Sequence, residues 1–196
     1  MLAPVGITVV VAAGNYGKSA AGAERYGSIG APGNDPSVIT VGAVNTRGTA
    51  SRADDSVNFF SSRGPPRGSY VDARGVRRFD NLLKPDLVAP GNKIVGALAT
   101  PSGSLLGLLG TDWNTLAENN ASLSSGYGGR MQLPNQGLMN LSGTSIAAPV
   151  VSGTVALMLQ ANPGLTPPLI KAMLQYSAQP LPGANLLQQG AGLLNI

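Results

Sequence analysis

Ser145 lies near the start of an apolar stretch, in a position where a serine could act as a nucleophile. Ser145 lies four residues before Pro149, which has no amide hydrogen to bond the carbonyl of Ser145. A helix tolerates that loss only near its start, so Ser145 should lie in or just before a first turn, beside unpaired amides and the positive end of the helix dipole. Such amides can stabilise the oxyanion that forms when a hydroxyl attacks a carbonyl. The alternative is that Ser142 and Thr144 are only helix caps and Ser145 is a small buried residue.

A side-chain amide follows an apolar run near the amino terminus. Asn15 comes directly after Val-Ala-Ala-Gly at residues 11–14. An amide at the carboxyl end of a buried strand can donate a hydrogen bond to a developing oxyanion, and such ends open onto the crevice where α/β sheets bind ligands. Gly-Asn is also common in ordinary turns, so these residues alone do not separate a site from a turn.

Two apolar, β-branched runs predict the strands that would position these groups. Residues 6–13 and 38–44 are typical of fully buried strands in a parallel sheet. The apolar run from Met1 to Gly14 also invites a signal-peptide interpretation. No Lys or Arg precedes that run and Asn15 follows it, which favours the strand. Shorter apolar pieces at residues 86–89 and 94–97 surround a Pro-Gly turn.

Two helices are predicted in the last third of the chain. Residues 144–161 are apolar nearly all round, which is typical of a core helix, and Asn-Pro ends the run. Thr166 looks like the N-cap of a second helix that has Pro167 in its first turn and runs to about Ser177. Its expected buried stripe consists of Leu169, Ile170, Met173 and Leu174. Buried strands combined with apolar helices predict an α/β layered sheet.

The remaining segments carry no regular pattern. Residues 45–83 look irregular, and residues 98–137 are rich in Leu, Gly, Ser and Asn without a steady period. A connection as long as the latter is usually a functional loop or an insertion. We therefore expect one domain over residues 1–196, with residues 98–137 as a loop or insertion within it.

The composition excludes several classes of protein. Apolar residues make up 43% of the chain and charged residues 11%, which suits a buried interior. The net charge is +4, but the densest arginines are spread through residues 63–78 among aspartates, so we expect a solvated loop and no nucleic-acid partner. There are no cysteines and no histidines. No run reaches the roughly 18 apolar residues of a membrane span.

Six segments, taken together and in order, resemble the subtilisin-like serine peptidases, or subtilases. They are Ala-Ala-Gly-Asn at 12–15, Pro-Ser-Val-Ile-Thr-Val-Gly-Ala at 36–43, Phe-Ser-Ser-Arg-Gly-Pro at 60–65, Lys-Pro-Asp-Leu-Val-Ala-Pro-Gly at 84–91, Gly-Thr-Ser-Ile-Ala-Ala-Pro at 143–149, and Gly-Ala-Gly-Leu-Leu-Asn at 190–195. The resemblance implies an α/β, parallel-sheet, three-layer subtilisin-like fold, of which this chain holds the carboxy-terminal part only. It also makes Ser145 the catalytic nucleophile and Asn15 the side-chain oxyanion donor.

The same resemblance implies a primary substrate pocket and a polypeptide substrate. One wall would be Ala12, Ala13 and Gly14, and the base would lie near Gly30, Ala31, Pro32 and Gly33. None of these residues is charged, so we expect a pocket for apolar or uncharged side chains. No cofactor is needed for the chemistry and no metal site is expected; structural calcium is common in the family and leaves little trace in the sequence. Secretion is implied by the resemblance alone.

The base that would activate Ser145 is missing. In subtilisins it is a histidine oriented by an aspartate, in the chain order Asp, His, Ser. Both precede the oxyanion asparagine in the family, whereas here only fourteen residues precede Asn15 and the chain has no histidine. We therefore expect a serine endopeptidase that lacks its amino-terminal half and is inactive alone. Val150, where many subtilisins carry a further histidine, is not at a catalytic position.

Other interpretations stay open at this point. The chain could be one half of a split peptidase, or a pseudopeptidase that binds peptides without cleaving them. A Ser–Lys pair would need a desolvated lysine beside the serine, from among Lys18, Lys84, Lys93 and Lys171. The related sedolisins use a carboxylate base, but they carry aspartate at the position of Asn15.

Overall fold

The computed structural model describes residues 6–97, 121–123 and 138–195. These residues form two compact units. The first unit combines Met1–Asn92 with Gly143–Ile196, and the second is Lys93–Ser142. Every segment with a predicted catalytic residue belongs to the first unit.

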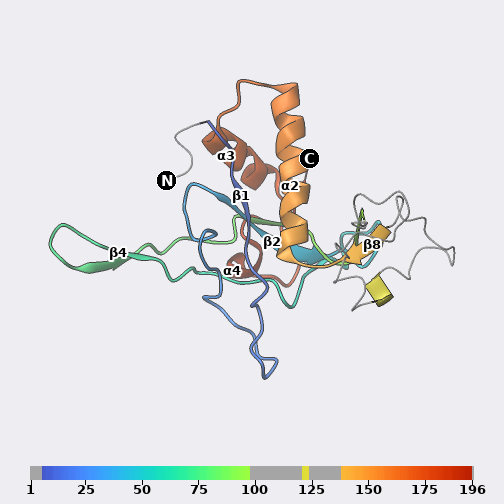
Figure 1. Ribbon diagram of the computed structural model, residues 1–196, viewed down its shortest axis with the longest axis horizontal. Helices are drawn as coiled ribbons and strands as arrows, with labels where there is room; N and C mark the ends of the chain where they lie inside the picture. The colour runs from blue at the N-terminus through green and yellow to red at the C-terminus, as the bar shows by residue number, and fades with distance from the viewer. Residues whose placement is uncertain (1–5, 98–120, 124–137, 196) are drawn as a thin grey trace, which may run out of the picture. The chain divides into compact units, whose positions relative to one another are not determined.

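The first unit is built on a mixed sheet (Figure 1). The central strand β2 (Ile39–Asn45) pairs in parallel with β1 (Val10–Ala12) on one side and with β6 (Leu87–Pro90) on the other. The short strand β3 (Ser56–Val57) pairs antiparallel with the end of β2. The predicted parallel arrangement is confirmed, and β2 is buried along almost its whole length.

Strand β1 differs from the prediction of a fully buried strand at residues 6–13. It is a strand only over Val10–Ala12, and these residues are half-buried. Among the described residues, β1 pairs only with β2, so its other edge has no neighbour to cover it. The β-branched sequence therefore predicted the strand correctly but not its place at the edge of the sheet.

Helix α2 (Thr144–Ala161) has the predicted bounds and packs across β1, β2 and β6 (Figure 1). Its buried residues lie on one face, and they share a core with the strands and with α3. The prediction of a core helix is only half right, since apolar residues on the other faces, such as Leu157, are exposed among the described residues (Leu157 by 60%). By length and composition alone α2 could also cross a membrane, but here it packs on the sheet.

Helix α3 (Pro167–Ser177) also has the predicted bounds. Ile170 and Leu174 are buried in the core, whereas Leu169 and Met173 are 47% and 43% exposed. The predicted stripe of four residues is thus half wrong, because α3 contacts the rest of the unit along one row of side chains four residues apart. Thr166 is the N-cap residue, but its side chain accepts no hydrogen bond.

The opposite side of the sheet carries a smaller apolar cluster. Val44 and Val88 pack there against Leu181 and Leu193 from the carboxy-terminal segment. This segment includes an unpredicted short helix, α4 (Leu186–Gln189), which begins at a capping box formed by Asn185 and Gln188. With α2 and α3 on one side and this segment on the other, strands β2 and β6 are covered on both faces.

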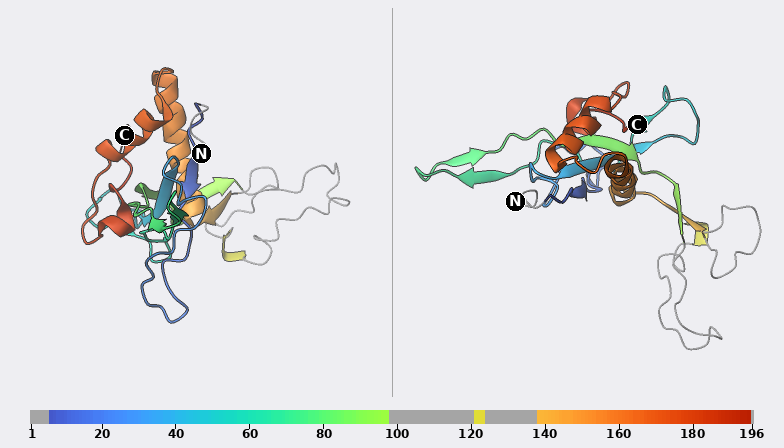
Figure 2. Two further views of the ribbon diagram at one scale, coloured as in Figure 1. Left: turned by 90° about the vertical axis from the view of Figure 1, so that its left-hand side faces the viewer. Right: turned by 90° about the horizontal axis from the view of Figure 1, so that it is seen from above.

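Residues 45–83 were predicted to be irregular, and this is wrong for part of the segment. Besides β3, it contains an antiparallel hairpin of β4 (Ser69–Val71) and β5 (Arg77–Phe79). Both strands are exposed throughout, and the hairpin stands away from the sheet (Figures 1 and 2). The carboxylate of Asp72 accepts hydrogen bonds from two amides of the turn, and these bonds together with Arg78 lower its pKa. An Asp-x-x-Gly turn was the available signal.

The second unit contains a two-stranded antiparallel pairing. Strand β7 (Ile94–Ala97) pairs with β8 (Leu138–Leu141), and the 3₁₀ helix η2 (Ala121–Leu123) belongs to the same unit. The predicted loop or insertion, residues 98–137, lies outside the described residues apart from η2.

Candidate active site

The backbone amide of Ser145, in the first turn of α2, has no hydrogen-bond acceptor among the described residues. Gly143 is the N-cap and Ser145 is the second helical residue, with an exposed side chain. The amides of Ile146 and Ala147 donate to the carbonyl of Gly143, at 3.0 and 3.2 Å. The amide of Thr144 donates to a side chain described next. Of the four amides at this helix start, only that of Ser145 has no hydrogen-bond partner among the described residues.

Asn15 caps α2 from the far end of the sequence. Its Oδ1 accepts hydrogen bonds from the amide and the hydroxyl of Thr144, both at 3.0 Å. The same hydroxyl accepts a bond from the amide of Gly14 at 3.1 Å. Two donors on Oδ1 fix the orientation of the amide group, because an amide nitrogen could accept neither bond. The Nδ2 group of Asn15 is therefore left to donate elsewhere.

A small space beside Gly143 brings the reactive groups together. A Cβ atom at Gly143 would lie 3.0 Å from Ser145 Oγ, 3.4 Å from Asn15 Nδ2 and 3.7 Å from the amide nitrogen of Ser145. A hydroxyl and two N–H donors thus surround one point that only glycine leaves open. Such an arrangement can hold a carbonyl carbon next to the hydroxyl and its oxygen next to the donors.

A second serine, to which sequence reasoning gave no role, holds the turn that carries Asn15. The amide of Ser62 donates to the carbonyl of Gly14 at 2.8 Å, and its hydroxyl accepts from the amide of Tyr16 at 3.1 Å. A Cβ at Gly14, where φ is +102°, would lie 2.9 Å from Ser62 Oγ. Only glycine therefore fits both the backbone conformation and the close approach. The Phe-Ser-Ser motif was the available signal.

The two predicted pocket segments are anchored to the same stretch of chain. Ala12 ends β1, and Ala13 and Gly14 follow it to reach Ser62, whereas residues 30–33 follow Ser28. Ser28 in turn exchanges hydrogen bonds with Arg63, the residue after Ser62. Ala13 and Gly33 are buried, while residues 30–32 are exposed. The primary substrate pocket that these segments would form stays a prediction.

A buried ion-pair network lies at the amino ends of β2 and β6. Lys84 is 1% exposed, and its Nζ donates to Asp86 Oδ2 at 2.7 Å, to Thr40 Oγ1 at 2.9 Å and to the carbonyl of Val38 at 3.0 Å. Lys171 pairs with the other oxygen of Asp86 at 2.9 Å. Burial lowers the pKa of Lys84, and the carboxylate of Asp86 opposes that shift.

This network removes two lysines from the candidates for a Ser145 base. Lys84 and Lys171 bind at the amino ends of parallel strands, whereas Asn15 follows the carboxyl end of β1. Lys18 Nζ lies over the ring of Phe59, 5.3 Å from its centroid. The 196 residues contain no histidine, and no side chain of the described residues forms a hydrogen bond with Ser145 Oγ.

The described residues do not bring three His, Cys, Asp or Glu side chains together as metal ligands. This finding does not test the expectation of no metal site, because calcium in the family is bound partly by backbone carbonyls.

Comparison with known protein families and sequences finds subtilisin-like proteases. Residues 4–192 match the subtilase family of peptidases. The chain is 34% identical to the serine protease AprX of Bacillus subtilis over 190 residues, which are 97% of this chain and 34% of AprX. It is 29% identical to the human membrane-bound transcription factor site-1 protease over 174 residues, which are 87% of this chain and 12% of that protein.

Solved structures agree with the sequence comparison. The chain superposes on fervidolysin from Fervidobacterium pennivorans, a keratinolytic enzyme related to subtilisin, with a TM-score of 0.59 and 26% identity over 97% of this chain and 22% of that one. The prenylagaramide maturation protease PagA gives 0.54 and 26% over 96% and 48%. The chain thus spans about a third of the length of AprX and less than half of either structure. Its fold is subtilisin-like, and the chain belongs to the subtilase family.

Proposed function

We propose that this chain supplies the nucleophile and the oxyanion donors of a serine endopeptidase whose general base comes from a polypeptide segment outside the 196 residues. The observation that supports the proposal is the space beside Gly143, which Ser145 Oγ, Asn15 Nδ2 and the Ser145 amide surround. A site of this kind acts on acyl groups, and the relatives AprX and site-1 protease are named as proteases.

Each group has a defined role in peptide-bond hydrolysis. Ser145 Oγ attacks the carbonyl carbon while its proton passes to the base. The carbonyl oxygen becomes an oxyanion that accepts hydrogen bonds from Asn15 Nδ2 and the Ser145 amide. The intermediate then collapses, the C–N bond breaks, and the amine leaves with the proton from the base. Water then attacks the ester carbonyl while its proton passes to the base, and Ser145 Oγ leaves with that proton, which releases the carboxylic acid.

Two exposed surfaces support docking of a missing amino-terminal half. The outer edge of β1 is unpaired among the described residues, which is a ready template for another strand. Ile7, just before that strand, is 62% exposed, and Leu157 on the outer face of α2 is 60% exposed. A domain half that covered both would bury apolar surface and could place a histidine beside Ser145.

Without that half, we propose that the chain is practically inactive. Loss of the histidine costs about 10⁶ in kcat in a subtilisin, while the oxyanion hole and binding retain roughly 10³–10⁴ over water. The proposed substrate is a polypeptide with an apolar or uncharged side chain in the primary pocket, and no cofactor takes part. Secretion is part of the proposal on family grounds, and immunoblotting the culture medium of the source cells would test it.

A second candidate is a pseudopeptidase that binds peptides without cleaving them, favoured by the absence of a histidine. Its site would not need both a nucleophile and an oxyanion donor, so we place it second.

Fluorophosphonate labelling separates the two candidates. The chain would be incubated with the reagent alone and after co-refolding with the amino-terminal half of the AprX peptidase domain. We expect labelling of Ser145 only in the second sample and none in a Ser145→Ala variant. Asn15→Ala should slow labelling by about 10²–10³, the cost of losing one oxyanion donor in a subtilisin. No labelling of a complex shown to form by size-exclusion chromatography would refute the peptidase proposal.

A further inference from the structure

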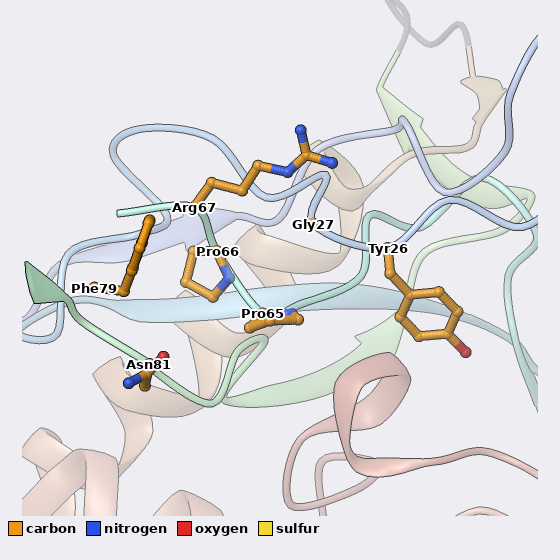
Figure 3. Close-up of a pocket in the computed structure, with 7 residues that line it drawn as sticks. All are labelled: Tyr26, Gly27, Pro65, Pro66, Arg67, Phe79 and Asn81. Carbon is orange, nitrogen blue, oxygen red and sulfur yellow. The ribbon is translucent and has the colours of Figure 1, made fainter. Parts of the chain in front are cut away.

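A pocket of about 440 Å³ lies at the base of the β4–β5 hairpin. Three segments line it, and none of its lining residues belongs to the candidate active site (Figure 3). The lining residues are Tyr26, Gly27, Pro65, Pro66, Arg67, Phe79 and Asn81. Ligand pockets span roughly 300–1,000 Å³, so the volume suits one or two side chains better than a large cofactor.

The floor of the pocket is apolar and held in place. Pro65 and Pro66 lie between Phe79 on one side and Tyr26 on the other (Figure 3). The Tyr26 hydroxyl accepts a hydrogen bond from Asn185 at 2.8 Å. Phe79 is 64% exposed at the pocket wall, so an apolar occupant would cover a large aromatic surface that now faces solvent.

The guanidinium group of Arg67 lies at the rim of this floor. The Arg67 side chain extends over Gly27, and its Nε lies 2.7 Å from where a Cβ of Gly27 would be (Figure 3). Its guanidinium makes no hydrogen bond or ion pair with any residue that the structure describes. Five donors on one planar group are therefore available to a carboxylate.

The charges around the hairpin also favour an acidic ligand. Arg63 pairs with Glu24 and Arg78 with Asp72, each at 2.9 Å. Within the described residues, Arg67, Arg74 and Arg77 have no such partner. The acidic Asp80, between the lining residues Phe79 and Asn81, has its carboxylate against Gly68, and these three arginines outnumber it. Among the described residues, the outer backbone edge of each hairpin strand is unpaired, and an extended peptide can use such an edge whereas a nucleic acid cannot.

We propose that this pocket binds an acidic polypeptide segment, with an apolar side chain between Phe79 and the two prolines and a neighbouring carboxylate paired to Arg67. The site is separate from Ser145, and the proposal does not depend on peptidase activity. Glu or Asp next to Phe or Leu in an extended segment has the required chemistry. The ligand is an acidic segment of a partner protein.

Fluorescence anisotropy of a labelled peptide tests the proposal. The 196-residue chain carrying Ser145→Ala, which prevents turnover, would be titrated into fluorescein-Gly-Glu-Phe-Glu-Gly in about 0.1 M salt. We expect saturable binding that Arg67→Glu weakens at least tenfold, since charge-assisted hydrogen bonds contribute about 1.5–3 kcal/mol. Phe79→Ala should weaken it about fivefold. Arg74→Glu is the matched control, because it makes the same charge change in the hairpin turn, and we expect less than about a threefold effect.

Three results would overturn the proposal. The first is no saturable binding below about 1 mM peptide. The second is an equal effect of Arg67→Glu and Arg74→Glu or equal binding of Gly-Lys-Phe-Lys-Gly, since either outcome would show that binding is not specific for a carboxylate at Arg67. The third is a short DNA duplex that binds more tightly than the peptide and also depends on Arg67. Both arginines are exposed, so matching thermal melts of the variants would show that folding is unaffected.

Discussion

Replacing Lys84 by Met should destabilise the protein strongly, because it leaves Asp86 buried with too little positive charge. Asp86 is 3% exposed, and its Oδ2 accepts from Lys84 and from the amide of Thr40, both at 2.7 Å. Removing one partner of a buried pair costs about 3–5 kcal/mol. Lys171 and the Thr40 amide remain, so we expect the lower end, about 3 kcal/mol.

The matched comparison is Lys171→Met. Its side chain is 19% exposed, so water can compensate for part of the lost pair with Asp86, and we expect a cost of about 1 kcal/mol. The double variant Lys84→Met/Asp86→Asn removes both buried charges while keeping an acceptor for the Thr40 amide. It should be more stable than Lys84→Met alone by about 1–2 kcal/mol.

Urea unfolding followed by circular dichroism at pH 7 measures all three variants. A cost below about 1 kcal/mol for Lys84→Met, or an equal cost for Lys171→Met, would refute the reasoning. The network also affects the predicted pocket, because Thr40 Oγ1 accepts from Lys84 and donates to the carbonyl of Gly33 at 2.7 Å. Lys84→Met should therefore increase proteolytic cleavage around Gly33 before global unfolding.

Three further predictions concern the site and one buried carboxylate. Asp55 is 6% exposed, and its Oδ1 has no hydrogen-bond partner among the described residues. Burial raises its pKa above the ordinary value of 3.8. The contribution of the protonated side chain to the free energy of unfolding is therefore complete below pH 3.8 and is lost as the pH rises through the raised pKa. Asp55→Asn should therefore stabilise the protein by about 1 kcal/mol at pH 7 and leave it unchanged near pH 3, as measured by thermal melts; equal effects at both pH values would contradict this. Gly143→Ala places a methyl group 3.0 Å from Ser145 Oγ at a backbone φ of +156° and should abolish fluorophosphonate labelling of the reconstituted complex; circular dichroism checks that the variant folds, and full labelling would contradict the geometry. Thr144→Val removes the acceptor of the Gly14 amide and one of the two donors to Asn15 Oδ1. It should lower the free energy of unfolding in urea by about 1–3 kcal/mol and slow labelling, and unchanged labelling would contradict this reasoning.

Sequence reasoning predicted the elements whose ends carry local signals. Helices α2 and α3 have the predicted bounds because Asn-Pro and Thr-Pro punctuate the chain there, and β2 is the β-branched run that was expected. What covers each face depends on distant segments, so the exposed side of α2 and the exposed Leu169 and Met173 of α3 were not predictable from periodicity.

The site itself was predictable only in part. The positions of Asn15 and Ser145 follow from a strand end and a proline near a helix start. The bonds that orient them join residues 129 positions apart, from Asn15 to Thr144, and local pattern carries no trace of that contact. The Lys84 network was also missed, because nothing in a single sequence marks a lysine as buried rather than solvated.

A crystal structure of the fluorophosphonate adduct on Ser145, formed in the reconstituted complex, tests the central claim most directly. The account predicts a phosphonyl oxygen in the space beside Gly143, about 2.7–3.1 Å from both Asn15 Nδ2 and the Ser145 amide nitrogen. A phosphonyl oxygen that points away from both donors, or an adduct on another residue, would contradict it.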